Sequence, residues 1–245
     1  MGCNRRLRPL FTYMTNEKII LDRRLGAVSS LVRAGVTLYD VGSDHAYLPA
    51  YLLQEGIISR AVVSDINEGP ISRARATLEN AGVMDRAQTV LTDGLNGIVL
   101  LPPCDVSVAG MGGELISSII DAKPELKDGR INLILQPMTK PEVLRAYLSS
   151  SGYEIQREIT VTEGKIYTVI LCSYTGKPYS LTEAELYVGV GGAREESDEF
   201  YSLVKSKISI LRAIADGKRL GGGDVSDEER LISSLETILN ERGKK

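Results

Sequence analysis

The sequence has few of the residues that support zinc sites, disulfides or membrane insertion. Among 245 residues it has one histidine and three cysteines, which lie far apart at positions 3, 104 and 172. This spacing fits neither a zinc site nor a disulfide framework, so we expect no metal and a reducing, cytoplasmic environment. No apolar run approaches the roughly 20 residues that cross a bilayer. Nor does one follow the N-terminal arginines, so we expect no membrane span and no secretory signal.

An excess of positive charge is also absent. The chain has 29 basic and 32 acidic residues, a net charge of −3, with 43% apolar residues overall. This excludes a globally basic nucleic-acid binder but leaves room for a local patch, since phosphates are bound by clustered Lys and Arg. The candidate patch, which could equally be a solvated face, consists of arginines near the N-terminus: Arg5, Arg6, Arg8, Arg23, Arg24 and Arg33.

Strand-like and helix-like segments alternate through the first 176 residues. An amphipathic helix ends near Val32, and apolar runs typical of strands follow at 36–42, 61–66, 87–94, 104–113 and 131–137. Helical segments lie between them at 46–56, 69–82 and 114–122, and another at 139–152 precedes two strands within 153–173. This order predicts an α/β fold with a mostly parallel sheet, helices on both faces and an antiparallel terminal strand.

The pattern changes near residue 180. Apolar residues then recur every three or four positions from Phe200 to Ala215 and from Leu231 to Ile238, with "GGGD" between. This predicts a coiled-coil-like helical hairpin. We expect an N-terminal extension (1–17), a main domain (18–176) and a helical domain (177–245). Capping boxes are expected at Thr139–Glu142, Thr182–Glu185 and Ser226–Glu229.

Acidic residues follow three successive predicted strands. Asp40 ends the first, Asp65 the second and Asp93 the third, and ligands of open α/β sheets bind at this edge. An acid after the second strand is placed to accept hydrogen bonds from a ribose. An NAD enzyme would also need G-x-G-x-x-G, whereas this first loop has one glycine and two acids, which would repel a pyrophosphate. S-adenosylmethionine, cationic and free of phosphate, fits better. Asp40 and Gly42 would then face its methionine end, Asp65 the ribose and Asp93 the adenine.

The fourth strand ends in "AGMGG", residues 109–113, where a methyl acceptor would lie. Glycines allow a flat ligand to approach the backbone, although they also allow tight helix packing. No cysteine nucleophile is near, so the acceptor should already carry a lone pair, such as a ring nitrogen. Asp44 could stabilise the positive charge that forms on it or cap the next helix. Tyr47 could stack on the base or only pack on a helix, and His45 is a structural hydrogen-bonding residue or a base.

Four segments together resemble the bacterial tRNA (adenine-N1)-methyltransferase family that acts at position 22, the TrmK type. They are "DVGSDHAYLPAYLL", Gly69–Pro70, "AGMGGELI" and "LILQP", and the resemblance covers roughly residues 18–245. It implies a class I, Rossmann-like methyltransferase with a C-terminal helical domain, S-adenosyl-L-methionine as cofactor, and tRNA as substrate. We therefore expect no DNA or membrane partner, and a monomer or weak dimer.

The residue patterns and the resemblance together give the expected roles. The expected catalytic residues are Asp44, His45 and Tyr47. Those expected to bind the cofactor are Asp40, Gly42, Ser43, Asp65, Ile66, Asp93, Gly94, Ala109 and Gly110. Those expected to bind substrate are Met111, Gly112, Gly113, Gln136, Pro137 and the arginines Arg23 and Arg24.

Two positions depart from the family pattern. Asp65–Ile66 replaces a Glu-Val pair, a conservative change, and Met138 stands where an asparagine is expected after "QP". Met138 leaves open a different RNA target or a non-catalytic module that binds RNA or protein. An NAD-dependent oxidoreductase is the third hypothesis.

Overall fold

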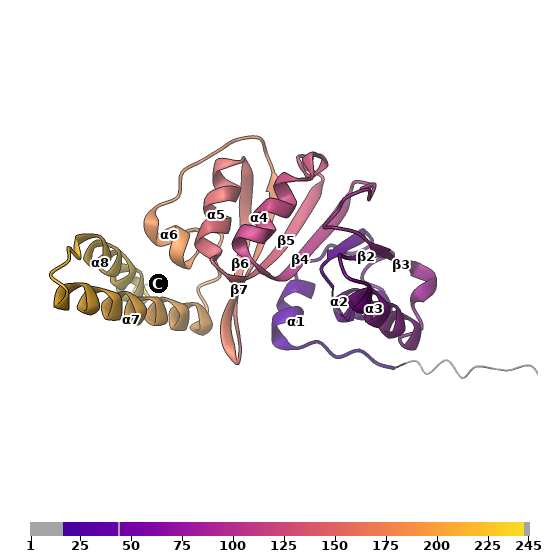
Figure 1. Cartoon of the computed structure of the whole chain (residues 1–245), viewed down its shortest axis with the longest axis horizontal. Coiled ribbons are helices and arrows are strands. Elements are labelled where there is room, and N and C mark those ends of the chain that lie inside the picture. The colour runs from indigo at the N-terminus through magenta and orange to yellow at the C-terminus, as the bar shows by residue number, and fades with distance from the viewer. Residues whose placement is uncertain (1–16, 44, 243–245) are drawn as a thin grey trace, which may run out of the picture.

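Seven strands form one sheet, and the computed structural model describes the chain over residues 17–43 and 45–242. The strand order is β3-β2-β1-β4-β5-β7-β6 (Figure 1). The first five strands are parallel: β1 (Thr37–Val41), β2 (Arg60–Asp65), β3 (Ala87–Leu91), β4 (Cys104–Gly112) and β5 (Ile131–Thr139). The chain winds outward from β1 in both directions, and such a switch point is where open α/β sheets bind ligands.

A long hairpin completes the sheet. Its strands β6 (Tyr153–Glu163) and β7 (Lys165–Tyr174) meet at Gly164, whose φ of +67° suits a tight turn. The antiparallel strand is β7, which pairs with β5 on one side and β6 on the other. The predicted mixed, Rossmann-like sheet is confirmed. The antiparallel strand β7 is the second strand from the edge, and β6 forms the edge itself.

Helices cover both faces because alternate strand residues point to opposite sides. Leu38 packs in a core with α1 (Arg23–Ser29), α2 (Tyr47–Gln54) and α3 (Glu68–Asn80). Its neighbour Tyr39 packs in a second core with α4 (Gly113–Asp121) and α5 (Pro141–Ser150). Two short 3₁₀ turns, η1 (Met84–Arg86) and η2 (Pro124–Leu126), lead into β3 and toward β5. Figure 1 shows the two helical layers on either side of the sheet.

Three further helices lie beyond the hairpin end of the sheet: α6 (Glu183–Val188), α7 (Asp198–Leu220) and α8 (Ser226–Glu241) (Figure 1). The predicted stripe from Phe200 to Leu211 packs against Leu231 and Leu235 in a third apolar core, and Ala215, where the predicted stripe ends, is also buried. The expected helical hairpin is therefore present. The limits of the expected domains stay predictions, and residues 1–16 of the expected extension lie outside the described residues.

A buried ion pair anchors the C-terminal helices to the sheet. The guanidinium of Arg145 on α5 donates to Glu158 Oε2 on β6 from two nitrogens, at 2.9 and 2.7 Å. Its third nitrogen donates to the Leu186 carbonyl on α6, at 2.7 Å, while Glu158 Oε1 accepts from the Val190 backbone, at 2.9 Å. Both side chains are fully buried. The pair thus joins one helix, one strand and the segment that leads to α7.

The predicted helix ends agree with the structure in part. The capping box at Thr182 is present, with the Glu185 carboxylate accepting a hydrogen bond from the Thr182 backbone N–H. The boxes at Thr139 and Ser226 are wrong: Thr139 ends β5 and Lys140 is the N-cap of α5, while Val225 precedes α8. Neither N-cap residue makes a side-chain cap, because the Lys140 and Val225 side chains carry no hydrogen-bond acceptor.

Within the described residues, no helix is long and apolar enough to cross a membrane. The same residues contain no group of three or more His, Cys, Asp or Glu side chains placed to hold a metal ion.

Candidate active site

Asp40 lies at the centre of the carboxyl edge of the sheet, opposite Ser107 on β4. Its carboxyl group is buried and accepts a hydrogen bond from the Ser107 hydroxyl, with a further one from Ser43. Burial raises the pKa of Asp40, and the two hydroxyls offset part of that rise. A buried carboxylate that lacks a basic partner is stabilised by a cationic ligand.

The turn after β1 needs glycine at position 42. Gly42 has φ +71°, and its backbone N–H donates to the Ser64 carbonyl at 2.8 Å. A Cβ at this position would overlap the Cε of Met111, which lies in the irregular end of β4. Two of the predicted loops therefore meet here, with the methionine side chain lying against the bare glycine backbone.

A cavity of about 390 Å³ opens beside this turn. It brings together eight of the predicted residues: Asp40, Gly42, Ser43, His45, Tyr47, Ala109, Gly110 and Arg24. Asp22 and Leu25, beside Arg24 at the start of α1, also line its wall. The ends of β1 and β4 thus form one pocket, and the start of α1 covers part of it.

His45 and Tyr47 form a flat aromatic surface at this cavity. Their rings stack with centroids 5.1 Å apart and planes within 4° of parallel, and Tyr47 is 44% exposed. Ala46 between them is left-handed, at φ +54°, and is the N-cap of α2. An exposed ring of this kind offers a face to a nucleobase. Asp44, the third residue expected to be catalytic, lies outside the described residues, so both its roles stay predictions.

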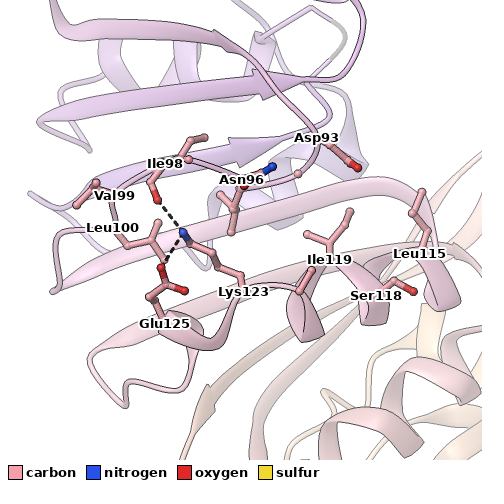
Figure 2. Close-up of a pocket in the computed structure, with 14 residues that line it drawn as sticks. Asp93, Asn96, Ile98, Val99, Leu100, Leu115, Ser118, Ile119, Lys123 and Glu125 are labelled. Carbon is pink, nitrogen blue, oxygen red and sulfur yellow. Dashed lines mark hydrogen bonds and ion pairs between the residues drawn. The ribbon is translucent and has the colours of Figure 1, made fainter.

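The expected ribose and adenine residues lie further along the edge. Asp65 Oδ1 accepts from the Asn67 backbone at 2.8 Å, and Ile66 is exposed. Asp93 and Gly94 form a turn, closed by a hydrogen bond from Asn96 to the Asp93 carbonyl at 3.0 Å. They also line a larger cavity, of about 850 Å³, between the 93–100 segment and α4 (Figure 2). Asp65 and Ile66 line neither cavity, so their cofactor contacts stay predictions.

The larger cavity has a charged end made by the chain itself. Lys123 donates to the Ile98 carbonyl at 2.8 Å and pairs with Glu125 at 3.0 Å, as Figure 2 shows. Because Glu125 already compensates the positive charge of Lys123, this lysine offers little attraction to a ligand phosphate.

Gln136 organises the loop expected to receive the substrate. Its side chain is fully buried, and its Oε1 accepts from the Gly110 backbone at 3.1 Å and from Arg24 Nη1 at 2.7 Å. Its Nε2 donates to the Pro137 carbonyl at 3.0 Å. Gly110 has φ +83° within an irregular stretch of β4. Substrate contact by Gln136 stays a prediction. Its amide holds the 109–113 segment in place through the hydrogen bond from the Gly110 backbone.

The last glycines of this loop serve packing as well. A Cβ on Gly113 would overlap the backbone carbonyl of Lys140, so glycine lets α4 begin tightly against the end of β5. Gly112 faces the Thr139 hydroxyl, and Pro137 is buried in β5. The packing interpretation of these residues is therefore supported, and their contact with a substrate remains a prediction.

A family model described as TrmK, tRNA (adenine(22)-N(1))-methyltransferase, matches residues 38–234. The chain belongs to the TrmK family. A Bacillus subtilis (strain 168) tRNA (adenine(22)-N(1))-methyltransferase is 34% identical over 156 residues, covering 63% of this chain and 66% of that protein. The crystal structure of the B. subtilis TrmK m1A22 tRNA methyltransferase has a TM-score of 0.73 and 27% identity, covering 91% of this chain and 97% of that one.

A second solved structure shows a TrmK-like protein with a ligand. It is a *Streptococcus pneumoniae* protein, described as a proposed tRNA (m1A22) methyltransferase, in complex with S-adenosyl-L-methionine. The TM-score is 0.75 at 28% identity, and the match covers 88% of this chain and 99% of that chain. The helical C-terminal part therefore belongs to the shared TrmK fold together with the sheet.

The two arginines expected to contact phosphate are engaged within the chain. Arg23 is 61% exposed and pairs with Glu199 on α7 at 2.8 Å. Arg24 is mostly covered, with its guanidinium on Gln136 and 3.8 Å from Asp22. Phosphate binding by them stays a prediction. The role of Arg24 as a wall of the cavity was missed, because no local pattern places it beside a residue 112 positions away.

Proposed function

We propose that this chain transfers a methyl group from S-adenosyl-L-methionine to N1 of adenine 22 in tRNA. Family membership supports the reaction and the substrate. The observation that carries the proposal is the 390 Å³ cavity, where a buried Asp40 and the Gly42 turn face the loop held by Gln136. Cofactor and acceptor sites are thereby adjacent, as direct transfer requires.

The residues of the cavity fit S-adenosylmethionine. The Asp40 carboxyl is buried without a basic partner among the described residues, so an ammonium or sulfonium would compensate its charge. The Gly42 turn lets the methionine part approach the backbone, and Asp65 and Asp93 are assigned to the ribose and the adenine amino group. When bound, the cofactor supplies an electrophilic methyl group on a positively charged sulfur.

The chain supplies orientation and charge for the transfer. The lone pair of adenine N1 forms the new bond to the methyl carbon as the bond from that carbon to sulfur breaks, and positive charge moves onto the adenine. N1 needs no strong base, so His45 acts chiefly by supporting Tyr47, and the Tyr47 ring stacks on the target adenine. Asp44 is assigned to the positive charge of the methylated ring.

The target adenine must leave the tRNA stack to reach this cavity, and flipped bases are held by stacking and edge hydrogen bonds. We assign the edge contacts to the 109–113 loop and to residues 136–138. Met138 is 43% exposed, and its sulfur lies 3.6 Å from Gln136 Nε2. Since Met138 replaces the expected amide, a non-catalytic, RNA-binding role is the second candidate.

We propose that the chain acts on tRNA rather than DNA, in the cytoplasm, as a monomer or weak dimer. The apolar stripes of α7 and α8 support this state, because they bury each other within one chain. The test of function combines purified protein, labelled S-adenosylmethionine and tRNA, followed by digestion to nucleosides. Labelled N1-methyladenosine supports the enzyme. Cofactor and tRNA binding without turnover supports the non-catalytic module, and calorimetry with NAD tests the oxidoreductase.

A further inference from the structure

A groove separate from the cofactor cavity runs between the sheet and the C-terminal helices. Its volume is about 450 Å³, and it lies between the end of β5, the start of β7 and one side of α7. The side chains that matter for its chemistry are those of Lys140, Lys165, Tyr167, Tyr187 and Lys207.

The groove is basic in a chain whose net charge is −3. Three lysines line it against one acid, Glu142. Lys140 is paired with Glu114 at 2.7 Å. Lys165 and Lys207 have no acidic partner among residues 17–43 and 45–242; Lys207 Nζ instead lies 5.7 Å from the centre of the Tyr187 ring. Two cations are thus available to an anionic ligand.

Aromatic rings accompany the lysines. Tyr167 on β7 is half-buried and lines the groove, as does Tyr187 on α6. Proteins that hold single-stranded nucleic acid combine a positive groove with rings on which bases stack. A small phosphate ligand would need the cations but not the aromatic walls, so the combination favours a nucleotide strand.

The groove begins where the predicted acceptor site ends. Pro137 and Met138 line it, and they directly follow Gln136, whose amide holds Gly110 at the wall of the cofactor cavity. A strand whose adenine enters the cavity can therefore continue past Met138 toward Lys207 on α7.

From this charge, these rings and this continuity, we propose that the groove binds the tRNA strand next to the target adenine. Lys165 and Lys207 contact its phosphates, and Tyr167 stacks on a neighbouring base. The proposal rests on the proposed function for its choice of RNA. It assigns the phosphate contact to the lysines of β7 and α7 rather than to the internally paired Arg23 and Arg24.

The experiment compares the double variant Lys165→Ala/Lys207→Ala with the matched control Lys205→Ala. Lys205 lies on α7 two residues from Lys207, is exposed, and does not line the groove. Binding of tRNA is measured at several salt concentrations. The double variant should bind more weakly, and the slope of log K against log salt should fall by about 2, since each phosphate contact contributes about 1. Lys205→Ala should retain the wild-type slope.

Two further measurements keep the result interpretable. Unchanged S-adenosylmethionine affinity and unchanged thermal unfolding of the double variant show that it is folded. With that shown, an unchanged tRNA affinity and salt slope would contradict tRNA binding by the groove. Wild-type protein that binds tRNA through these lysines but makes no N1-methyladenosine would instead contradict the proposed function, and tRNA binding by the groove would still be supported. Tyr167→Leu should weaken tRNA binding and Tyr167→Phe should not, because only the ring is needed for stacking.

Discussion

Arg24 Nη1 donates a hydrogen bond of 2.7 Å to the buried Oε1 of Gln136, 112 positions further along the chain. The same oxygen accepts from the Gly110 backbone. The N-terminal helix therefore supports the loop at the wall of the cofactor cavity through one shared amide.

Arg24→Ala should lower turnover more than it lowers tRNA affinity. Its loss removes a charged donor from a buried acceptor, a change typically worth about 1.5–3 kcal/mol, and loosens the 109–113 loop. Steady-state kinetics with tRNA separate the two effects: kcat should fall, with KM and the salt dependence of binding near wild type. Arg23→Ala is the matched control, since its ion pair is exposed and contributes little. Equal effects of the two variants would contradict a positioning role for Arg24.

Asp40→Asn should weaken S-adenosylmethionine binding. The variant keeps the shape and an acceptor for Ser107 but loses the charge that compensates the cationic cofactor. A charge-assisted hydrogen bond worth about 1.5–3 kcal/mol corresponds to roughly a 10- to 150-fold rise in Kd. Calorimetry measures this directly, and an unchanged Kd would contradict the placement of the methionine end beside Asp40.

The pH dependence of Asp40 has a definite sign. Burial raises its pKa above the ordinary aspartate value of 3.8, so its contribution to stability is present at low pH and is lost as pH rises through the folded pKa. Asp40→Asn lacks this loss, so the ligand-free variant should gain stability relative to wild type as pH increases. Cofactor affinity of the wild type should fall as pH drops through the raised pKa, whereas that of the variant should not.

Gly42→Ala should destabilise the protein and impair cofactor binding. The φ of +71° costs a residue with a Cβ about 1–2 kcal/mol, and the new methyl group must displace Met111. Gly26→Ala is the control, because Gly26 lies in α1 with nothing within 4 Å of the added Cβ. It should be neutral or slightly stabilising. Denaturant unfolding measures both, and equal stabilities of the two variants would contradict the strain assigned to position 42.

Glu158→Gln should be strongly destabilising because it leaves the Arg145 charge buried and uncompensated. Removing one partner of such a pair costs about 3–5 kcal/mol, and here it also loosens the anchor of the C-terminal helices. The control is Glu236→Gln, which breaks an exposed pair with Arg212 and should change the free energy of unfolding by less than about 1 kcal/mol. Similar losses in both variants would show that the buried pair is not the anchor.

The sheet was predictable because its information is local. Each signal can be recognised within a short window of sequence: the apolar runs, the periodic stripe from Phe200, and the glycines that end helices, such as Gly56 and Gly82. In the structure both glycines have left-handed backbone conformations. The loop "DVGSDHAYLP" was also recognisable, and the structure brings most of its described residues into one cavity.

The contacts between distant segments were not predictable. Nothing near Arg24 indicates its hydrogen bond to Gln136, which forms only when α1 packs on the sheet. Nothing near Lys165 indicates that Lys207 lines the same groove, which exists only once α7 lies beside the sheet. The wrong capping box at Thr139 has the same cause: pairing of β5 extends through Thr139, so tertiary structure overrides a local motif. At Ser226 the cause is local: its backbone N–H and its hydroxyl donate to the Asp224 carboxylate, and the helix begins at Ser226 itself.

Methylation of tRNA tests the central proposal most directly. Purified protein is incubated with labelled S-adenosylmethionine and either a tRNA carrying adenine 22 or the same tRNA with guanine there. We predict labelled N1-methyladenosine from the first tRNA, mapped to position 22, and none from the second. No labelled nucleoside from the first tRNA at saturating cofactor, or equal labelling of both, would contradict the proposed function.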